Sequence, residues 1–599
     1  MKSFNKINTA RFNRTIKTLA LGAVVAMTCS CEDFLTIYPT NDVVLENYWK
    51  TKNDVENMVN NSYRMMTTGD FTKRLIVWGE LRGDNVVEGN NLGDDIKNIM
   101  EANLLPQNGY NDWSIFYKII NNCNIVLKYA PQVLDEDPDF TEGDLDVIRG
   151  EMLAIRALCH FYLVRAFRDI PLLDYAVIDD DQNLYQPQVS PREALDFILS
   201  DLYEAENLVM ASGKYPVLAD NKGRITRDAV RAIIADALLW RAAFEQYAAQ
   251  GGTADVAEYY TKCAEYCDMI INDRNAYVKE YEEENRITSI GWKDDKYPLE
   301  HHPLTNAGNT GILDNPYSQI FGTPNNVRES IFEIQHSSTS DNANFEVPAF
   351  YGYYGLTDFT LGPLSAPRYM AEKSNEGLYA QTDFRRVSFI EHEDGEADLY
   401  NIIKFNYIRA SGTIDKPDYK NAAILKSTGT KDNNTYIMTQ TNWIVYRITD
   451  VMLMKAEALA FRNDTTNGNT KDLENAFALT KAVYDRSNPY IKASTDTLTY
   501  THGSAASLQE VILEERQREL AFEGKRWFDL VRKALRDGNT GPMLDILINN
   551  KYESNQKAIR SKMTAMDCLF FPILERELHA NPLLKQNPAY ETEDLFEKN

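Results

Sequence analysis

Hydrophobic residues recur at three- and four-residue spacing in several segments of the chain, which is the spacing of one face of an α-helix. In residues 151–168 the apolar stripe includes Ala154, Leu158 and Phe161, and Asp169 to Pro171 end the predicted helix. Further helices are predicted at residues 191–210 with Ser190 as N-cap, 226–249, 254–271, 443–461, 471–486 and 508–536. These helices follow one another as pairs with small residues at close-packing positions, as in tetratricopeptide-type units, although no strict repeat period is present.

The pattern changes between residues 273 and 442, where helical periodicity fades and Gly, Pro, Asn and Tyr become frequent. A loop-rich region of this length inside a helical protein is typical of a binding surface. We therefore expect a mainly α fold, a tetratricopeptide-like helix-pair scaffold with a loop-rich, irregular ligand-binding region. The predicted parts are residues 1–30, 31–272, 273–442 and 443–599: a signal peptide, an N-terminal helical part, a loop-rich insertion and a C-terminal helical part.

The net negative charge of the chain limits the classes of molecule that it can bind. The 599 residues carry a net charge of -25, and the first thirty contain five basic and no acidic residues, so the remainder stands at about −30. Such an acidic surface repels phosphate backbones, which argues against nucleic acid and favours neutral ligands. With hydrophobic residues at 44%, the chain can form a packed interior.

The N-terminus resembles an export signal: a basic stretch, an apolar run at residues 19–27, and then Thr28-Cys29-Ser30-Cys31. Nine apolar residues are too few to cross a bilayer, which needs about 20. Cys31 follows small Ser30 and precedes an acidic pair, so we predict cleavage before Cys31 and acylation of its thiol, with membrane attachment through this lipid anchor. The alternative is ordinary signal-peptide cleavage with incidental cysteines.

Motifs for common chemistry are missing from the sequence, which has no phosphate-binding Gly-Lys loop, no HExxH and no GxSxG. Residues 135–146 resemble a calcium loop, but Phe140 occupies the place that needs Gly. Cys263 and Cys267, four apart in a predicted helix, lack further ligands nearby and are interpreted as buried free thiols. We expect no cofactor, no metal site and no catalytic residue.

An acidic and arginine-rich segment stands out near the C-terminus. Glu515, Glu519, Glu523 and Asp529 are interleaved with arginines. Ion pairs with these arginines lower carboxylate pKa values, whereas a general acid needs a raised pKa. The segment is therefore interpreted as an internal salt-bridge network.

The same segment closely resembles the C-terminal signature of the SusD/RagB family, nutrient-binding lipoproteins of Bacteroidetes. The matching residues are Glu515-Arg516, Glu519-Leu520, Phe522-Glu523-Gly524, Arg526, Phe528-Asp529-Leu530 and Arg532. The stretch FFPILERELHANPLLKQNPAY is similar to the closing motif of the family, with Leu574 and Ala589 replacing its usual Pro and Gly. Shorter similarities lie at residues 31–35, 79–85, 113–124, 156–171 and 447–458, so the resemblance covers essentially the whole mature chain.

The resemblance implies a function without catalysis. Members of the family cap a TonB-dependent (SusC-like) outer-membrane transporter and pass glycans, or in some cases peptides, into its barrel. We therefore expect a lipid-anchored protein on the outer face of the outer membrane that binds a neutral glycan or peptide. Two alternatives stay open: a surface-attached glycan hydrolase, and a structural subunit of the transporter that binds no ligand.

Aromatic residues are the candidates for sugar contact, because their faces stack on the apolar face of a pyranose ring while amides and charges bind hydroxyl groups. Three groups are predicted to line the ligand surface: Trp78 with Arg82, Asp84 and Asn85; Trp292 with Tyr297; and Tyr351, Tyr353 and Tyr354. The alternative for each aromatic residue is that it packs beneath its own loop.

Overall fold

The computed structural model describes residues 48–179, 181–249, 255–284, 291–292, 296–300, 302–303, 316–322, 328–337, 342–354, 359–360, 362–371, 377–391, 400–405, 408–413, 416–424, 441–466, 470–489, 497–552 and 554–591. Cys31 lies outside these residues, so its lipidation stays a prediction.

Long helices dominate both ends of the described chain. The N-terminal helices are α3 (Lys52–Met66), α4 (Gly69–Gly79), α5 (Asp94–Met100), α6 (Ser114–Tyr129), α7 (Val133–Glu136), α8 (Glu142–Phe167), α9 (Pro191–Leu208), α10 (Asp220–Gly223), α11 (Arg227–Ala248) and α12 (Ala257–Glu284). The C-terminal helices are α18 (Ile448–Thr466), α19 (Thr470–Ser487), α20 (Ala505–Leu520), α21 (Arg526–Asp537), α22 (Gly541–Asn550), α23 (Gln556–Lys562) and α24 (Glu575–Ala580). Short 3₁₀ turns are η2 (Gly109–Asn111), η3 (Ala130–Gln132), η6 (Met566–Leu569) and η7 (Pro588–Tyr590).

Side-chain caps define where several helices begin. Thr51 and Thr141 each form a capping box, in which the hydroxyl accepts from the third helical amide and an aspartate there accepts from the threonine amide. Ser190 accepts from the amide of Glu193 at 3.3 Å, and Pro191 occupies the first helical position, where its missing N–H costs nothing. The predicted N-cap at Ser190 is therefore confirmed.

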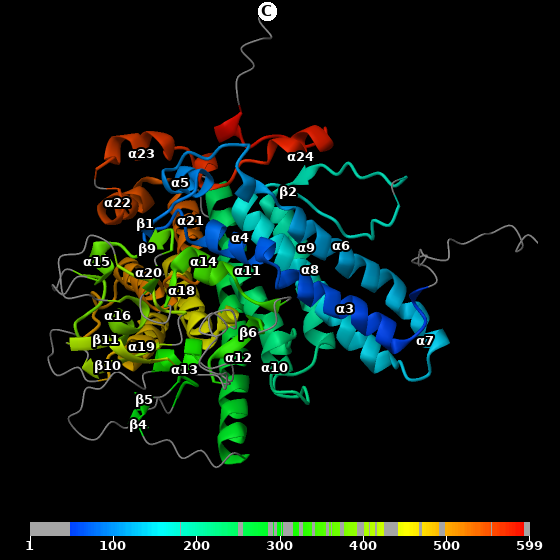
Figure 1. The fold of residues 1–599 in the computed structure, drawn as a ribbon, viewed down its shortest axis with the longest axis horizontal. Coiled ribbons are helices and arrows are strands. Elements are labelled where there is room, and N and C mark those ends of the chain that lie inside the picture. The colour runs from blue at the N-terminus through cyan, green and yellow to red at the C-terminus, as the bar shows by residue number, and fades with distance from the viewer. Residues whose placement is uncertain are drawn as a thin grey trace, which may run out of the picture.

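The helices form one continuous stack. Neighbours pack in the order α3, α6, α8, α9, α11 and α12, and α12 then packs against α18, which is followed by α19 and α20. In Figure 1, α11 and α12 lie in the centre, with α3, α6 and α8 on one side and α18, α19 and α20 on the other. One large hydrophobic core runs through both parts, so the N- and C-terminal helices form a single scaffold.

The described residues between α12 and α18 form short, irregular elements, as predicted. Its described elements are α13 (Pro316–Gly322), α14 (Glu346–Tyr351), α15 (Arg368–Ala371), α16 (Phe384–Phe389), β4 (Gly291–Trp292), β5 (His302–Pro303), β6 (Ser330–Ile334), β7 (Tyr353–Tyr354), β8 (Phe359–Thr360), β9 (Leu364–Ser365), β10 (Ile408–Thr413) and β11 (Lys416–Ile424). Three further strands are β1 (Val87–Glu88), β2 (Ile170–Pro171) and β3 (Gln188–Val189), and β12 (Trp443–Arg447) precedes α18. In the described residues the strands form two-stranded antiparallel pairs: β1–β9, β2–β3, β4–β5, β6–β12, β7–β8 and β10–β11.

The mainly α fold is confirmed, with three changes in its elements. Residues 443–447 form the strand β12, because Trp443 to Tyr446 are aromatic or β-branched, all five residues are buried, and the strand pairs with β6. The helix predicted at 508–536 is two helices, α20 and α21, broken at residues 521–525. The predicted boundary after residue 272 falls within α12, which continues to Glu284.

Candidate functional site

Trp78 lies in the interior. It comes from the last turn of α4, its side chain is 0% exposed, and its indole N–H donates to the carbonyl of Tyr110 at 2.9 Å. Its ring stacks against Phe116 with the centroids 4.9 Å apart and meets Phe167 edge-on. A ring enclosed in this way has no free face for a sugar, so the prediction that Trp78 lines the ligand surface does not hold in this arrangement.

The three polar residues after Trp78 are also buried, and they fasten the loop after α4 to the C-terminal part of the chain. The Arg82 guanidinium donates to the carbonyls of Leu569 and Cys568 at 2.8 and 2.6 Å, and it lies 4.0 Å over the ring of Trp527. Two of its nitrogens are thereby hydrogen-bonded within the protein, and the ring of Trp527 covers the cation. Arg82 thus binds the C-terminal part of the chain. In this position it does not contact a ligand, contrary to its predicted role.

Asp84 and Asn85 are 0% exposed and have partners within the protein. The Asp84 carboxylate accepts from both sides of the Arg526 guanidinium, at 2.6 and 3.0 Å. Burial alone would raise the pKa of Asp84, but Arg526 outweighs burial and lowers it. Asn85 donates to Glu80 at 2.8 Å and accepts from Gln517 at 3.0 Å. Both residues are therefore structural in this arrangement, contrary to the predicted ligand contact.

The tyrosine candidates divide into two groups. Tyr297 is 8% and Tyr351 is 1% exposed, and the Tyr351 hydroxyl donates to the carbonyl of Phe522 at 3.0 Å. These two rings pack beneath their loops, which was the alternative for each of them. Trp292 lies in β4, and Tyr353 and Tyr354 lie in β7, where the structure describes the backbone alone, so their ligand role stays a prediction.

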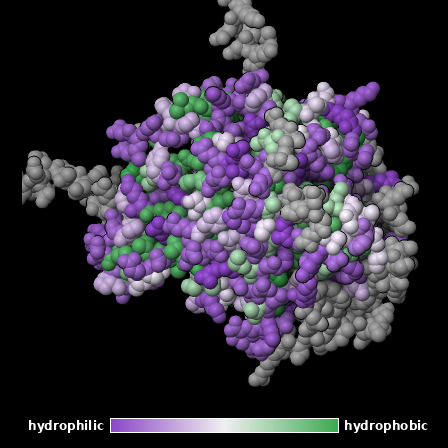
Figure 2. Space-filling model, turned by 180° about the vertical axis from the view of Figure 1, so that it is seen from behind, coloured by the Kyte–Doolittle hydropathy of each residue, from purple (hydrophilic) through white to green (hydrophobic). Residues whose placement is uncertain are grey.

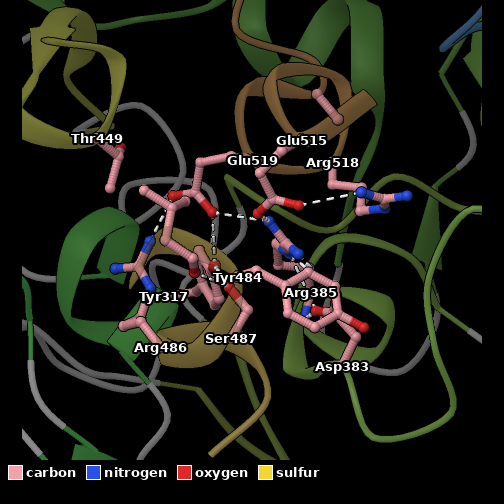
Figure 3. Close-up of polar contacts among 12 residues, drawn as sticks. Tyr317, Asp383, Arg385, Thr449, Tyr484, Arg486, Ser487, Glu515, Arg518 and Glu519 are labelled. Carbon is pink, nitrogen blue, oxygen red and sulfur yellow. Dashed lines mark hydrogen bonds and ion pairs between the residues drawn. The ribbon is translucent and has the colours of Figure 1, made fainter. Parts of the chain in front are cut away.

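A buried ionic network joins the loop-rich region to the C-terminal helices. Glu515 and Glu519 point from α20 toward Arg385 of α16, whose guanidinium donates to them at 2.6 and 3.1 Å (Figure 3). Arg447 of β12 reaches Glu519 at 2.6 Å, and Arg486 of α19 donates to the same carboxylate. The network also contains Tyr317, Glu329, Asp383, Lys404, Arg518 and Glu523. The predicted internal salt-bridge network is confirmed, and it extends well beyond the segment that indicated it.

The surroundings shift the carboxylate pKa values in opposite directions. Burial alone would raise the pKa of Glu519, but Arg486 and its neighbouring arginines outweigh burial and hold the pKa well below its usual value. The pKa of Glu523 is also lowered, against the effect of burial. For Glu515 burial prevails over Arg385 and raises the pKa. The prediction of lowered pKa values is confirmed for Glu519 and Glu523 and wrong for Glu515.

A raised pKa is what a general acid needs, but a general acid must also reach its substrate. The side chains of Glu515, Glu519 and Arg385 have no exposed area. Glu515 is held between Arg385 and Arg518, at 2.6 and 3.1 Å. These groups therefore order the α16 segment on the scaffold and offer no group to a ligand.

A second buried group, the Glu80 carboxylate, stabilises the turn between α20 and α21. The Glu80 carboxylate accepts from the amides of Phe522 and Gly524, at 3.1 and 2.9 Å, and from Asn85. Phe522 and Gly524 both have a φ of 69°, and neighbouring amides in a turn with such residues converge on an anion. Burial raises the pKa of Glu80 to about 7, although the three donors oppose this shift. Glu80 thus occupies the anion-binding turn that this backbone creates.

The residues considered for metal binding are two buried thiols and carboxylates that bind groups of the protein. Cys263 and Cys267 are buried and free, as predicted, and burial raises the pKa of the Cys263 thiol. Asp137 accepts from the amide of Lys52 at 2.8 Å, and Asp144 caps α8 and pairs with the Lys52 ammonium. Across the described residues no group of three or more His, Cys, Asp and Glu could hold a metal ion.

Exposed aromatic side chains are rare in the described residues, where Tyr185 at 50% and Phe345 at 55% are the ones with a large free surface. Phe345 immediately precedes α14 in the loop-rich region, and Tyr185 lies between β2 and β3. Neither residue was predicted from the sequence. A signal existed for Tyr185, which lies between Asn183 and Pro187 in a polar stretch without helical periodicity.

The described residues contain no helix that is both long enough and apolar enough to span a membrane. The rear face in Figure 2 is largely hydrophilic, and its hydrophobic residues form separate small groups.

Comparisons with known proteins extend over nearly the whole chain. A family model described as "SusD family" matches residues 400–590, and one described as "Starch-binding associating with outer membrane" matches residues 33–239. SusD-like protein P38 of Formosa agariphila is 25% identical over 572 residues, which cover 94% of this chain and 96% of the relative.

Solved structures share the fold at lower identity. A SusD superfamily protein from Bacteroides fragilis aligns with a TM-score of 0.61 and 17% identity, covering 91% of this chain and 100% of the other. A protein described as "Laminarin binding SusD-like protein" aligns with a TM-score of 0.59 and 20% identity, covering 90% and 100%. The two family models fit opposite ends of the helical stack, and the buried network contains Glu515, Glu519 and Glu523 of the C-terminal signature. This chain belongs to the SusD/RagB family.

Proposed function

We propose that this protein captures a neutral glycan at the cell surface and delivers it to a partner TonB-dependent, SusC-like transporter in the outer membrane. The observation that carries the proposal is the match of residues 33–239 to the family described as "Starch-binding associating with outer membrane". The laminarin-binding protein of the same fold supports a glycan as the ligand class. A peptide is the second ligand class.

The arrangement of the loop-rich region is consistent with capture rather than chemistry. Arg385 and Lys404 fix separate loop segments to α20 and to the turn that follows it, through ion pairs of 2.6 Å to Glu515 and Glu523. A ligand surface held by such contacts is preorganised, which reduces the entropy lost on binding. The buried carboxylates that could perform acid–base chemistry are used in this attachment.

Phe345 is the described aromatic residue that best fits a stacking platform in the loop-rich region. Its ring is 55% exposed, while its backbone is fixed on both sides. The Asn344 amide donates to the carbonyl of Thr441 at 2.8 Å, and the amide of Val347 donates to Asn344 at 3.1 Å. We place Phe345 in the ligand surface together with the predicted Trp292, Tyr353 and Tyr354.

Binding without turnover is tested with purified protein containing residues 32–599. A glycan array identifies a ligand, and mass spectrometry of the incubated ligand should return it unchanged. Phe345→Ala should weaken binding, whereas Val217→Ala, which removes an equally exposed side chain at 55%, should leave it unaltered. Shortened products would identify a hydrolase instead. A protein that retains no glycan or peptide would be a structural subunit of the transporter.

The anchor and the partner are tested in cells. Replacing Cys31 by Ala should move the protein from the outer-membrane fraction to the soluble fraction, because the acyl chains supply its attachment. Purification of the tagged protein from detergent-solubilised membranes should recover a large β-barrel transporter. Recovery of the tagged protein alone would contradict the proposed partner.

A further inference from the structure

The loop between β2 and β3 presents an aromatic side chain on a firmly braced support. Tyr185 is 50% and Leu184 is 49% exposed. Within the loop, the Tyr175 hydroxyl donates to the carbonyl of Asn183 at 3.0 Å and accepts from the Gln186 amide at 2.9 Å. The amide of Tyr185 donates to the Asn183 side chain at 3.1 Å. The backbone that carries Tyr185 is therefore held by its own neighbours.

A second segment, distant in sequence, completes this surface. Asn581, just after α24, donates to the carbonyl of Gln186 at 2.8 Å, and the amide of Lys585 donates to Gln188 at 2.8 Å. Figure 1 shows α24 beside β2, where this loop begins. The amide of Leu583 donates to Asn581 at 3.0 Å, which holds a 48% exposed leucine next to the loop. Two chain segments thus meet at Asn581, and each carries exposed apolar side chains near this point.

We propose that Tyr185, with Leu184 and Leu583, forms a second glycan-contact site, on which the apolar face of one neutral pyranose ring stacks. This inference rests on the proposed function and assigns it a site outside the loop-rich region. The ring supplies the stacking face, and the side-chain amides of Asn183, Gln186 and Asn581, which already hydrogen-bond within the surface, bind sugar hydroxyls through their second N–H or second lone pair.

The composition of the surface favours a sugar over a protein partner. A stable protein interface covers about 800 Å² on each partner, with an apolar centre. Here the apolar surface is limited to a few side chains, and the adjacent α24 exposes Glu575, Arg576 and His579. The amides nearest to Tyr185 are uncharged and act as both donors and acceptors, as sugar hydroxyls require.

The test is affinity electrophoresis of the full mature chain in gels containing laminarin, soluble starch or another neutral polysaccharide from a panel. The polysaccharide that retards the wild type most is then used with the variants. Tyr185→Ala should weaken retention roughly two- to tenfold, the effect expected for one lost stacking contact. Tyr185→Phe keeps the ring and should bind like the wild type, as should Val217→Ala. Thermal unfolding of each variant verifies that the fold is intact.

The outcomes separate this inference from the proposed function. If the wild type is retarded and Tyr185→Ala is retarded equally, the second site is wrong while the proposed function stands. The same conclusion follows if Tyr185→Ala reduces only the recovery of a membrane-protein partner, because the surface is then a protein contact. If no polysaccharide in the panel retards the wild type, both the function and the site are overturned.

Discussion

Glu519→Ala should be strongly destabilising, because it removes the anion shared by three buried arginines. Arg447 and Arg385 reach Glu519 at 2.6 and 3.1 Å, Arg486 also donates to it, and the Tyr317 hydroxyl donates at 2.8 Å. Loss of one partner from a buried ion pair costs about 3–5 kcal/mol, since the remaining charge stays desolvated. The free energy of unfolding should fall by about this amount.

The same change can be expressed as a melting temperature. Unfolding entropy is about 2.1 cal/mol/K per residue near 60 °C, so a chain of 599 residues unfolds with about 1.3 kcal/mol/K. A loss of about 3–5 kcal/mol then lowers Tm by about 2–4 °C. Differential scanning calorimetry of the mature chain measures this shift, and urea unfolding provides the free-energy difference.

The matched control is Glu514→Ala, five residues earlier on the same helix. Glu514 pairs with Arg518 at 2.9 Å, but its side chain is 57% exposed. An exposed pair contributes about 0–1 kcal/mol, so this variant should change Tm by less than about 1 °C. Equal effects of the two substitutions would refute the reasoning, because burial would then not determine what the carboxylate contributes.

Acid pH tests the same group in the wild type. Because the arginines hold the pKa of Glu519 below its usual value, its contribution is present above the unfolded value of 4.5 and is lost as pH falls toward the lower folded pKa. The stability difference between the wild type and Glu519→Ala should therefore shrink below about pH 4.5. A difference that grows in acid would contradict the lowered pKa.

Three further predictions concern single contacts. Burial raises the pKa of Glu80 from 4.5 to about 7. Between pH 4.5 and pH 7 the folded state therefore keeps a proton that the unfolded state has released, and stability should fall as pH rises through that range. Glu80→Gln should flatten this slope in urea titrations at pH 5 and pH 7.5, and an unchanged slope would assign it to another group. Gly524→Ala should lower the urea midpoint, because its φ is 69° and an added Cβ would lie 2.6 Å from the Leu75 carbonyl, whereas Gly503→Ala, also at positive φ but with open space, should cost less. The buried Cys263 and Cys267 thiols should resist alkylation by a thiol reagent until the chain unfolds, whereas the half-buried Cys568 can react earlier; rapid labelling of Cys263 or Cys267 in the native protein, located by peptide mass mapping, would contradict their burial.

Helices with a regular apolar stripe could be predicted from the sequence, because local spacing determines their buried face. The helix predicted at residues 191–210 is α9, and it begins at the predicted cap because Ser190 and Pro191 are local signals too. β12 was mistaken for helix because its five residues are buried on both faces, and a short apolar run has no period that separates strand from helix. Its partner β6 lies about a hundred residues earlier, where local sequence gives no information on pairing.

The ligand candidates after α4 were misplaced for a similar reason. Arginine, aspartate and asparagine are usually exposed residues, and here they follow a tryptophan in the sequence. Exposed polar groups near an aromatic ring are typical of a sugar site. Asp84 is buried because Arg526, 442 positions away, neutralises it. Such a partner cannot be inferred from local composition, so only the fold distinguishes a buried ion pair from a binding group.

The contrast between buried and exposed residues also explains why the class of this protein was easier to infer than its ligand. Glu519, Glu523 and Arg526 belong to the family signature, and each is buried in ion pairs that join distant elements. A change at any of them removes several partners at once, so these positions encode the scaffold. Tyr185 and Phe345 bear no such constraint, because half of each side chain faces solvent. Under the proposed function the ligand is contacted by such exposed residues, which take no part in the buried ion pairs, so the signature carries no information about the ligand.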